Sequence, residues 1–150
     1  MSNALKFVTG LDPALEPALG PLLALAVGGA DPGSLNAALQ SYAPRDCHVL
    51  GARRQGDLVA VVGYACRSDA AVIRHIAVRR DAQRGGIGRR LLHEVTEMHP
   101  SLWVEAETDA EAIGFYERCG FEVLSLGERY PGTERFTVRR PPQAVHRSRH

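Results

Sequence analysis

The segment from Ile76 to Leu92 constrains the fold more than any other part of the chain. It begins with three apolar residues typical of a strand, continues through a turn rich in arginine and glycine, and ends in an amphipathic helix expected to begin near Gly86. The apolar stripe of that helix consists of Ile87, Leu91, Val95 and Met98. The first N–H groups of a helix lack intrahelical partners and carry partial positive charge. The segment therefore predicts a site for an anion, most simply a phosphorylated ligand.

Two familiar nucleotide sites are excluded at this turn. No Lys-Ser or Lys-Thr pair follows the glycines, so nothing would hold a γ-phosphate and Mg²⁺ as in a P-loop. The spacing Gly86-x-Gly88 lacks the third glycine of a dinucleotide fingerprint. What remains is the run from Gln83 to Gly88, which has the form Gln/Arg-x-x-Gly-x-Gly. It resembles the acetyl-CoA pyrophosphate loop of the GNAT acetyltransferase superfamily, and a glycine turn that merely starts a helix is the alternative.

A second motif supports this resemblance. The run from Ala112 to Phe121 resembles the GNAT pattern A-x-x-F/L-Y-x-x-x-G-F, and it follows the first motif at a suitable distance. We expect a strand over Leu102–Glu107 and a helix over Thr108–Cys119, begun by a Thr108/Glu111 capping box. Gly120 suits the left-handed position beyond the helix end. The resemblance covers about Val49 to Val138.

The resemblance implies an α/β (α+β) fold with a GNAT-like mixed, mostly antiparallel sheet of six to seven strands, helices on both faces and splayed central strands. Further strands are expected at Lys6–Thr9, Val49–Arg53, Leu58–Cys66, Ala71–Val78, Phe121–Leu126 and Arg135–Arg139. Helices are expected at Pro13–Val27, broken or kinked at Gly20-Pro21, and at Pro32–Tyr42. Residues 1–140 are predicted to form one GNAT-like domain, and residues 141–150 a disordered tail.

Net charge and cysteine content limit the classes of partner and the cellular compartment that we expect. The formal net charge is +1, which indicates neither a nucleic-acid surface nor a membrane surface. The three cysteines are scattered without metal-ligand spacing, and no signal peptide is evident, so we expect a cytoplasmic protein with reduced thiols and no metal. The expected partner is a small-molecule or peptide amine, and a homodimer is left open.

The family resemblance implies that acetyl-CoA is the co-substrate and lies where the strands Ala71–Val78 and Leu102–Glu107 splay apart. Its pantetheine arm would pair with backbone groups at the end of the first strand, and its pyrophosphate would meet amides of the glycine loop. The predicted cofactor-binding residues are Ile76, Ala77, Val78, Gln83, Arg84, Gly85, Gly86, Ile87, Gly88 and Arg89.

The resemblance assigns Tyr116 as the general acid that protonates the departing CoA thiolate. Helix phase places Phe115 and Cys119 toward the core and Tyr116 at the edge of their stripe. The alternative is a tyrosine that packs its ring and donates to a backbone carbonyl. A backbone N–H near Ile76 is the candidate donor to the oxyanion.

The base that deprotonates the amine has several candidates. Trp103, Glu105 and Glu107 share one strand face, and a carboxylate beside a tryptophan in a partly dry cleft can act as a base. Glu105 is the first choice, while Glu107 stands nearer the strand end. His75 on the neighbouring strand, or a water, is the alternative. Asp109 stands where many family members carry Asn, which puts an Asn-specific cofactor contact in doubt.

The resemblance places the acceptor between Ala14–Tyr42 and Gly127–Arg135, a region of mixed charge that does not identify the amine. Two functions follow. One is an N-acetyltransferase that moves an acetyl group from acetyl-CoA to a primary amine by direct attack. The other is a CoA-binding regulatory domain with little turnover.

Overall fold

The computed structural model describes residues 4–11, 16–26, 47–110, 112–130 and 133–143. Its strands are β1 (Leu5–Val8), β2 (Cys47–Arg54), β3 (Asp57–Cys66), β4 (Ala70–Val78), β5 (Trp103–Asp109), β6 (Glu122–Tyr130) and β7 (Thr133–Arg140). Its helices are α1 (Leu19–Ala26), α3 (Ile87–Met98) and α4 (Ile113–Arg118), with a 3₁₀ segment η1 (Arg80–Gly85). The predicted helix Pro32–Tyr42 and residues 144–150 of the predicted tail lie outside the described residues.

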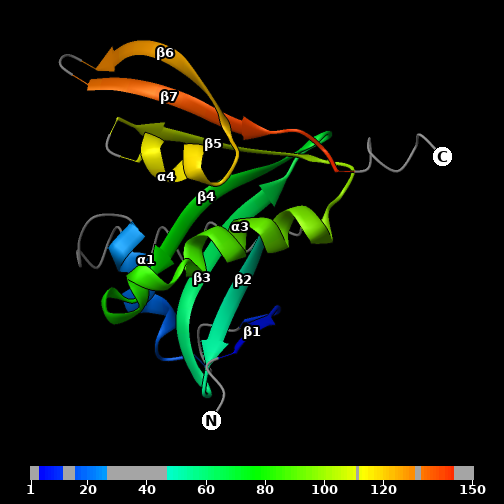
Figure 1. Cartoon of the computed structure of the whole chain (residues 1–150), viewed down its shortest axis with the longest axis vertical. Helices are drawn as coiled ribbons and strands as arrows, with labels where there is room; N and C mark the ends of the chain where they lie inside the picture. The colour runs from blue at the N-terminus through cyan, green and yellow to red at the C-terminus, as the bar shows by residue number, and fades with distance from the viewer. Residues whose placement is uncertain (1–3, 12–15, 27–46, 111, 131–132, 144–150) are drawn as a thin grey trace.

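The strands form one seven-stranded sheet in the order β1-β2-β3-β4-β5-β7-β6. Only the β4–β5 pair is parallel, and every other neighbouring pair is antiparallel. The predicted mixed, mostly antiparallel sheet is confirmed. Figure 1 shows the β5–β7–β6 part of the sheet and α4 at one end of the molecule, and β1, β2 and β3 toward the other.

Helices cover both faces of the sheet, as predicted. Along β3, Ala60, Val62 and Tyr64 belong to the larger core cluster, which also contains the buried residues of α3. Val61 points the other way and packs with Leu19 and Leu22 of α1. On α3 the predicted stripe is buried at Ile87, Leu91 and Val95. The expected burial of Met98 is wrong, because the residue ends the helix and is 41% exposed, while Leu92 is fully buried instead.

The two central strands pair along only part of their length. The β4–β5 ladder runs from Ala70 opposite Trp103 to Ile73 opposite Ala106, and ends there. Next to it, β3 pairs Tyr64 with Ile73 but Gly63 with His75, so Arg74 is an extra residue in a β-bulge. From the bulge to Val78, β4 follows β3 alone. The predicted splay is confirmed, and it leaves one edge of the end of β4 without a neighbouring strand among the described residues.

The predicted helix over Thr108–Cys119 begins later than expected. Thr108 and Asp109 belong to β5, where they lie opposite Phe136 and Arg135 of β7, and α4 begins only at Ile113. Antiparallel pairing with β7 holds Thr108 and Asp109 in extended backbone, so the helix does not begin there. The end of the helix is as predicted: Gly120 has φ 88°, and the N–H groups of Gly120 and Phe121 donate to Glu117 O and Tyr116 O at 3.0 and 3.1 Å.

Two other boundaries differ from the predictions. Helix α1 begins at Leu19, so Gly20 and Pro21 lie in its first turn instead of breaking it. Proline is tolerated there because first-turn N–H groups have no intrahelical acceptor. The predicted strands Phe121–Leu126 and Arg135–Arg139 are longer than expected, since β6 extends to Tyr130 and β7 starts at Thr133.

Candidate functional site

The glycine turn forms an open helix N-terminus. Gly86 caps α3 with φ 74°, a left-handed conformation that glycine adopts without strain. In the first backbone hydrogen bond of the helix, Arg90 N donates to Gly86 O at 3.1 Å. The three N–H groups before it, from Ile87 to Arg89, donate to no backbone carbonyl of the described residues. No acidic residue stands in this first turn, so the positive end of the helix is left uncompensated.

Two hydrogen bonds tie the start of the turn to the sheet, one to the end of β4 and one to β3. The side-chain amide of Gln83 donates to Val78 O at 3.0 Å, and Arg79 N donates to Val59 O at 2.7 Å. Gln83 thus engages the strand end with its amide nitrogen. These bonds hold the helix N-terminus at a constant position relative to the open edge of β4.

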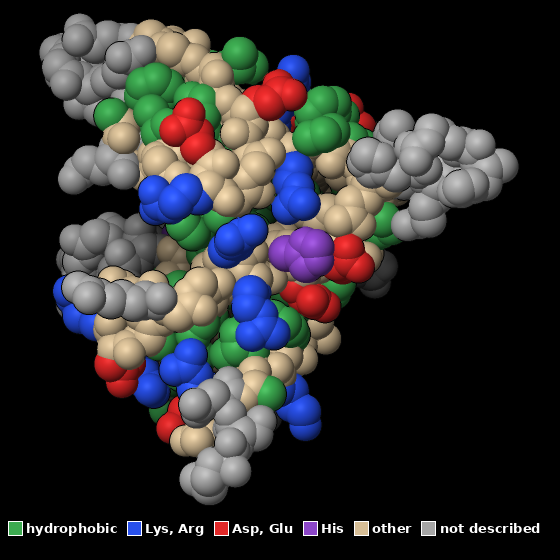
Figure 2. Space-filling model, viewed as in Figure 1, with side chains coloured by type: hydrophobic (Ala, Val, Ile, Leu, Met, Phe, Trp, Pro, Cys, Tyr) green, Lys and Arg blue, Asp and Glu red, His purple; other side chains and the backbone are tan. Residues whose placement is uncertain are grey.

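A hollow of about 460 Å³ lies between the end of β4, the start of α3 and α4. It is lined by Ile76, Ala77, Val78, Gln83, Gly86, Gly88, Arg89, Phe115, Arg118 and Cys119. Among the other predicted cofactor residues, Gly85 lines an adjoining hollow, and Ile87 is 1% exposed in the core. The side chain of Arg84 lies outside the described structure. Figure 2 shows basic side chains across the face over α3.

Gly88, a predicted cofactor-binding residue, lines the hollow and also has a packing role. A Cβ at this position would lie 3.2 Å from two atoms of the Phe115 ring and 3.6 Å from a Val78 methyl group. The missing side chain lets α3 approach α4 closely, and Phe115 forms one wall of the hollow. Gly88 therefore shapes the hollow through packing.

Three residues of the hollow were not predicted: Phe115, Arg118 and Cys119. Arg118 folds back over its own helix, with Nη1 3.2 Å from where a Cβ on Gly114 would stand. The Gly114-x-x-x-Arg118 spacing was the available sequence signal, because residues four apart lie on one helix face. Burial raises the pKa of the Cys119 thiol, against the opposing charges of Arg89, Arg140 and Arg118. Arg89 and Arg118 bring positive charge to the hollow from two different elements.

Tyr116 is buried, and the expected helix phase is wrong for Phe115 and Tyr116, whereas Cys119 is buried in the core as expected. Tyr116 is 5% exposed in the main core cluster, whereas Phe115 is only half-buried and lines the hollow. The ring of Tyr116 meets those of Phe115 and Phe121 edge-on, with centroids 5.1 and 5.4 Å apart. The tight turn at Gly120 brings Phe121 back over the helix, which changes the face that is covered.

The hydroxyl of Tyr116 forms no hydrogen bond with the described residues. Burial, followed by the nearby Cys119 thiol, raises its pKa to about 12. The phenol is protonated at neutral pH, as an ordinary tyrosine is, and the raised pKa makes it a weaker acid than an exposed phenol.

The candidate bases lie on the opposite face of the sheet. Val104 and Ala106 are 0% and 4% exposed and join the core cluster of Tyr116, so the half-buried Glu105 between them points away from it. Glu107 pairs with Arg135 across β7, with Oε1 3.3 Å from Nε. Trp103 lies beneath the guanidinium of Arg139, 4.7 Å from its ring centroid.

His75 shares the face of Glu105. It stands two residues before Ala77, whose side chain packs in the α1 cluster. Burial, and then the charge of Arg74, lowers its pKa, which favours the neutral, proton-accepting imidazole. Asp109 is part of β5, and its side chain lies outside the described structure. The sheet thus has a candidate acid on one face and two candidate bases on the other.

Among the described residues, no group of three or more His, Cys, Asp or Glu side chains could hold a metal ion. In the same part of the chain, no helix is both long enough and apolar enough to span a bilayer. Cys47, Cys66 and Cys119 form no disulfide bond among the described residues.

Comparison with known proteins identifies related sequences and folds. A family model described as an acetyltransferase (GNAT) domain matches residues 45–123. The curated [ribosomal protein bS18]-alanine N-acetyltransferase of Escherichia coli K12 is 38% identical over 68 residues, which cover 41% of this chain and 46% of that protein. The chain therefore matches less than half the length of this relative.

Solved structures share the fold over nearly the whole chain. The crystal structure of the ribosomal-protein-S18-alanine N-acetyltransferase from Escherichia coli has a TM-score of 0.75 at 23% identity, covering 92% of this chain and 94% of that one. An aminoglycoside 6′-N-acetyltransferase complexed with coenzyme A has a TM-score of 0.77 at 15% identity, covering 91% and 96%.

Proposed function

This chain belongs to the GNAT acetyltransferase family, and on that premise we propose that it moves an acetyl group from acetyl-CoA to a primary amine by direct attack. One observation carries the proposal. The open edge of β4, the uncompensated N-terminus of α3 and the arginines of α3 and α4 meet around one hollow. The amide-bearing arm of acetyl-CoA suits the open strand edge, and its phosphates suit the helix N-terminus and the arginines.

The residues present fit acetyl-CoA. The backbone of Ile76–Val78 would pair with the pantetheine amides, because β5 does not occupy that edge. The N–H groups from Ile87 to Arg89 would receive the pyrophosphate, and Arg89 and Arg118 would add charge. When bound, acetyl-CoA supplies the activated acyl group. No metal is needed for this transfer.

The two protons of the reaction are assigned to opposite faces of the sheet. Glu105, directly or through a water, would take the proton from the attacking amine, with His75 as the competing base. The amine nitrogen forms the bond to the acetyl carbon as the carbon–sulfur bond breaks. Tyr116 would deliver its phenolic proton to the departing thiolate. Support comes from the protonated phenol of Tyr116, whose hydroxyl forms no hydrogen bond with the described residues, and from the gap where β4 and β5 cease to pair.

The acceptor is proposed only as a class of amine. The curated relative's printed activity is on an alanine of a ribosomal protein, and the structural neighbour in complex with coenzyme A acts on an aminoglycoside. The sequence match to the first is the stronger observation, so we propose a peptide α-amine as the first acceptor class to test. The small-molecule amines are the second class.

Release of free CoA thiol, measured with a panel of alanine-initiated peptides, other peptides and aminoglycosides, tests the proposal. Thiol release that depends on one acceptor class supports acetyl transfer. Tight binding of acetyl-CoA by calorimetry without release for any acceptor would instead favour the regulatory CoA-binding domain. Failure to bind acetyl-CoA at all would refute both.

A further inference from the structure

The end of the β2–β3 hairpin carries two consecutive arginines that point to opposite faces of the sheet. On β2, Leu50 and Ala52 belong to the core cluster beneath α3, whereas Val49 packs with the α1 cluster. By the same alternation, Arg54 extends toward the α3 face and Arg53 toward the α1 face. The contacts of the two side chains agree with these directions.

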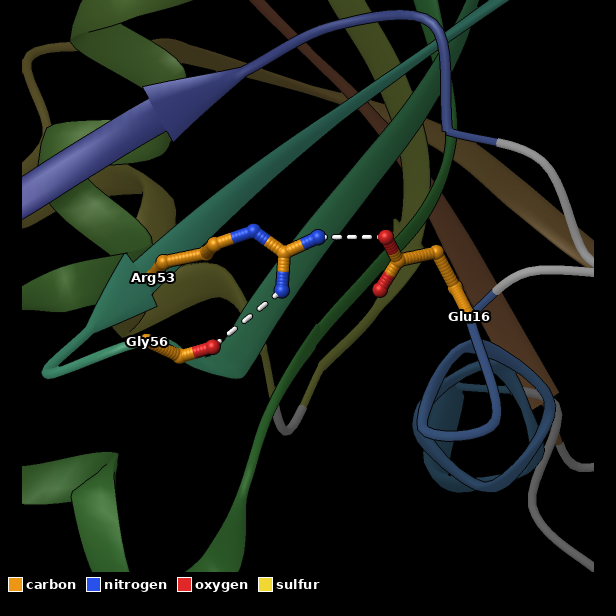
Figure 3. Close-up of polar contacts among 3 residues, drawn as sticks. All are labelled: Glu16, Arg53 and Gly56. Carbon is orange, nitrogen blue, oxygen red and sulfur yellow. Dashed lines mark hydrogen bonds and ion pairs between the residues drawn. The ribbon is translucent and has the colours of Figure 1, made fainter.

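Arg53 is fixed by contacts within the chain. Its Nη2 forms an ion pair with Glu16 Oε2, just before α1, and its Nη1 donates to Gly56 O at 3.4 Å (Figure 3). The two charged side chains are only 25% and 20% exposed. The hairpin turn that follows has positive φ at Gln55 and Gly56, 54° and 88°. The hairpin end is therefore anchored from the α1 face.

Arg54 is half-buried but has no equivalent partner. Its Nε is shielded from solvent and forms no hydrogen bond with the described residues. It makes no ion pair with Asp57, its neighbour across the hairpin, or with Asp81 of η1. Asp81 is paired with Arg79 at 2.6 Å. The hydrogen bond from Arg79 lowers the pKa of Asp81 most, and the charge of Arg54 adds a smaller effect in the same direction, but Arg54 forms no direct ion pair with that carboxylate. A half-buried cation without a direct ion-pair partner favours the approach of a further anion.

The place where Arg54 packs suggests which anion. Its Nη2 lies 3.4 Å from where a Cβ on Gly85 would stand, so the guanidinium rests against the glycine loop. Gly85 and Gly86 of that loop also line the hollow that adjoins the cofactor hollow. The Arg54 side chain thus packs against the loop, with an Nε that forms no hydrogen bond with the described residues.

We propose that Arg54 is a positioning residue for the cofactor: it holds the Gly85–Gly86 turn in place and supplies positive charge that the phosphates of acetyl-CoA complete. This inference rests on the proposed function, because the phosphates belong to that ligand. It adds a residue from a hairpin about thirty positions before the loop, on a strand that carries neither motif.

Arg54→Gln and Arg53→Gln form a matched pair, because each removes one charge from adjacent positions of the same strand. We expect Arg54→Gln to raise the KM for acetyl-CoA about 10-fold, with kcat at saturation within about twofold. The dependence of that KM on salt should weaken, since one screened attraction is lost. Arg53→Gln should lower the thermal midpoint but keep the KM for acetyl-CoA and its salt dependence. Arg54→Lys should restore most of the salt dependence.

A phosphate-free donor, S-acetylpantetheine, separates charge from scaffolding. Arg54→Gln and the unaltered protein should use it equally, whereas an equal loss on both donors would show a merely structural role and overturn the proposal. An unchanged KM for acetyl-CoA in Arg54→Gln would also overturn it. If Arg54→Gln does not fold, Arg54→Met, which also removes the charge, gives the same comparison through its KM. If the unaltered protein binds no acetyl-CoA, the proposed function itself fails, and that result is distinguishable from both.

Discussion

Helix α3 has a buried tyrosine near each of its ends, and the two tyrosines differ in their hydrogen bonding. Tyr64 is 1% exposed and Tyr116 5%, and burial raises the pKa of each to about 12. The hydroxyl of Tyr64 lies 2.9 Å from Nε2 of His99, at the C-terminal end of α3. The hydroxyl of Tyr116 has no such partner among the described residues. A raised pKa alone therefore does not distinguish a structural tyrosine from a candidate acid.

The ends of the helix show the same contrast. At the C-terminal end, His99 N donates to Val95 O at 3.1 Å, and the rings of His48 and Tyr64 stack 5.2 Å apart. At the N-terminal end, the first N–H groups face a hollow rather than a backbone acceptor. Polar groups satisfied within the chain stabilise the fold, while groups left unsatisfied beside a hollow are available to a ligand.

Gly86→Glu should abolish the proposed acetyl-CoA binding at the N-terminal end of α3. It forces a side chain into a left-handed conformation and places a carboxylate where a phosphate is proposed to bind. Strain and like-charge repulsion together should weaken acetyl-CoA binding about 1,000-fold. Calorimetry measures the affinity, and circular dichroism should show a retained fold.

Gly86→Asn is the matched control, because asparagine tolerates the left-handed conformation and carries no charge. It should keep acetyl-CoA affinity within about 10-fold of the unaltered protein. Equal affinity in Gly86→Glu and the unaltered protein would remove the loop from the cofactor site, and the contrast between the ends of α3 would lose its functional meaning.

The two tyrosines can be compared directly by removing each hydroxyl. Tyr116→Phe should lower kcat about 100-fold with little change in the KM for acetyl-CoA, because a general acid acts only as the thiolate leaves. Tyr64→Phe should leave kcat within about twofold, since its hydroxyl is engaged by His99. Steady-state thiol release measures both. A similar kcat in the two variants would mean that the unsatisfied hydroxyl has no special role.

The parts of the site that could be predicted depend on short-range sequence. Gly86 and Gly120 adopt the positive φ that their positions beside helix ends required, and the loop from Gln83 to Gly88 lies at the start of a helix as expected. The sheet and its splay followed from a family resemblance carried by two motifs. Local backbone requirements and motif spacing are both properties of neighbouring residues.

The parts that were wrong or missing depend on distant residues. β5 extends through Asp109 because β7, almost thirty residues later, pairs with it. Phe115 and Tyr116 exchange their expected environments because Phe121 turns back over α4. Arg54 reaches Gly85 only because the sheet brings a hairpin beneath the loop. None of these contacts has a periodicity that the sequence alone displays.

The hydrogen bond between Tyr64 and His99 at the C-terminal end of α3 should contribute to stability rather than to turnover. Tyr64→Phe removes a hydroxyl whose partner is a part-buried histidine nitrogen, and should lower the free energy of unfolding by about 1 kcal/mol. Urea unfolding followed by circular dichroism measures this change. Tyr116→Phe serves as the comparison, because no hydrogen bond to the described residues is lost there. A larger loss in Tyr116→Phe than in Tyr64→Phe would contradict the distinction between the two hydroxyls.

The smallest expected effect is the pH dependence of that stability. Burial, followed by the nearby His48, lowers the pKa of His99 below its ordinary value of 6.5. The unfolded chain therefore takes up a proton at His99 at a higher pH than the folded chain does. This histidine leaves stability undiminished above about pH 6.5, and stability declines as the pH falls from there through the lowered folded pKa. The decline should be reduced in His99→Gln, and in part also in His75→Gln, whose pKa is lowered in the same direction. Urea midpoints at several pH values between 7.5 and 5 test this, and an unchanged decline in His99→Gln would show that His99 titrates alike in the two states.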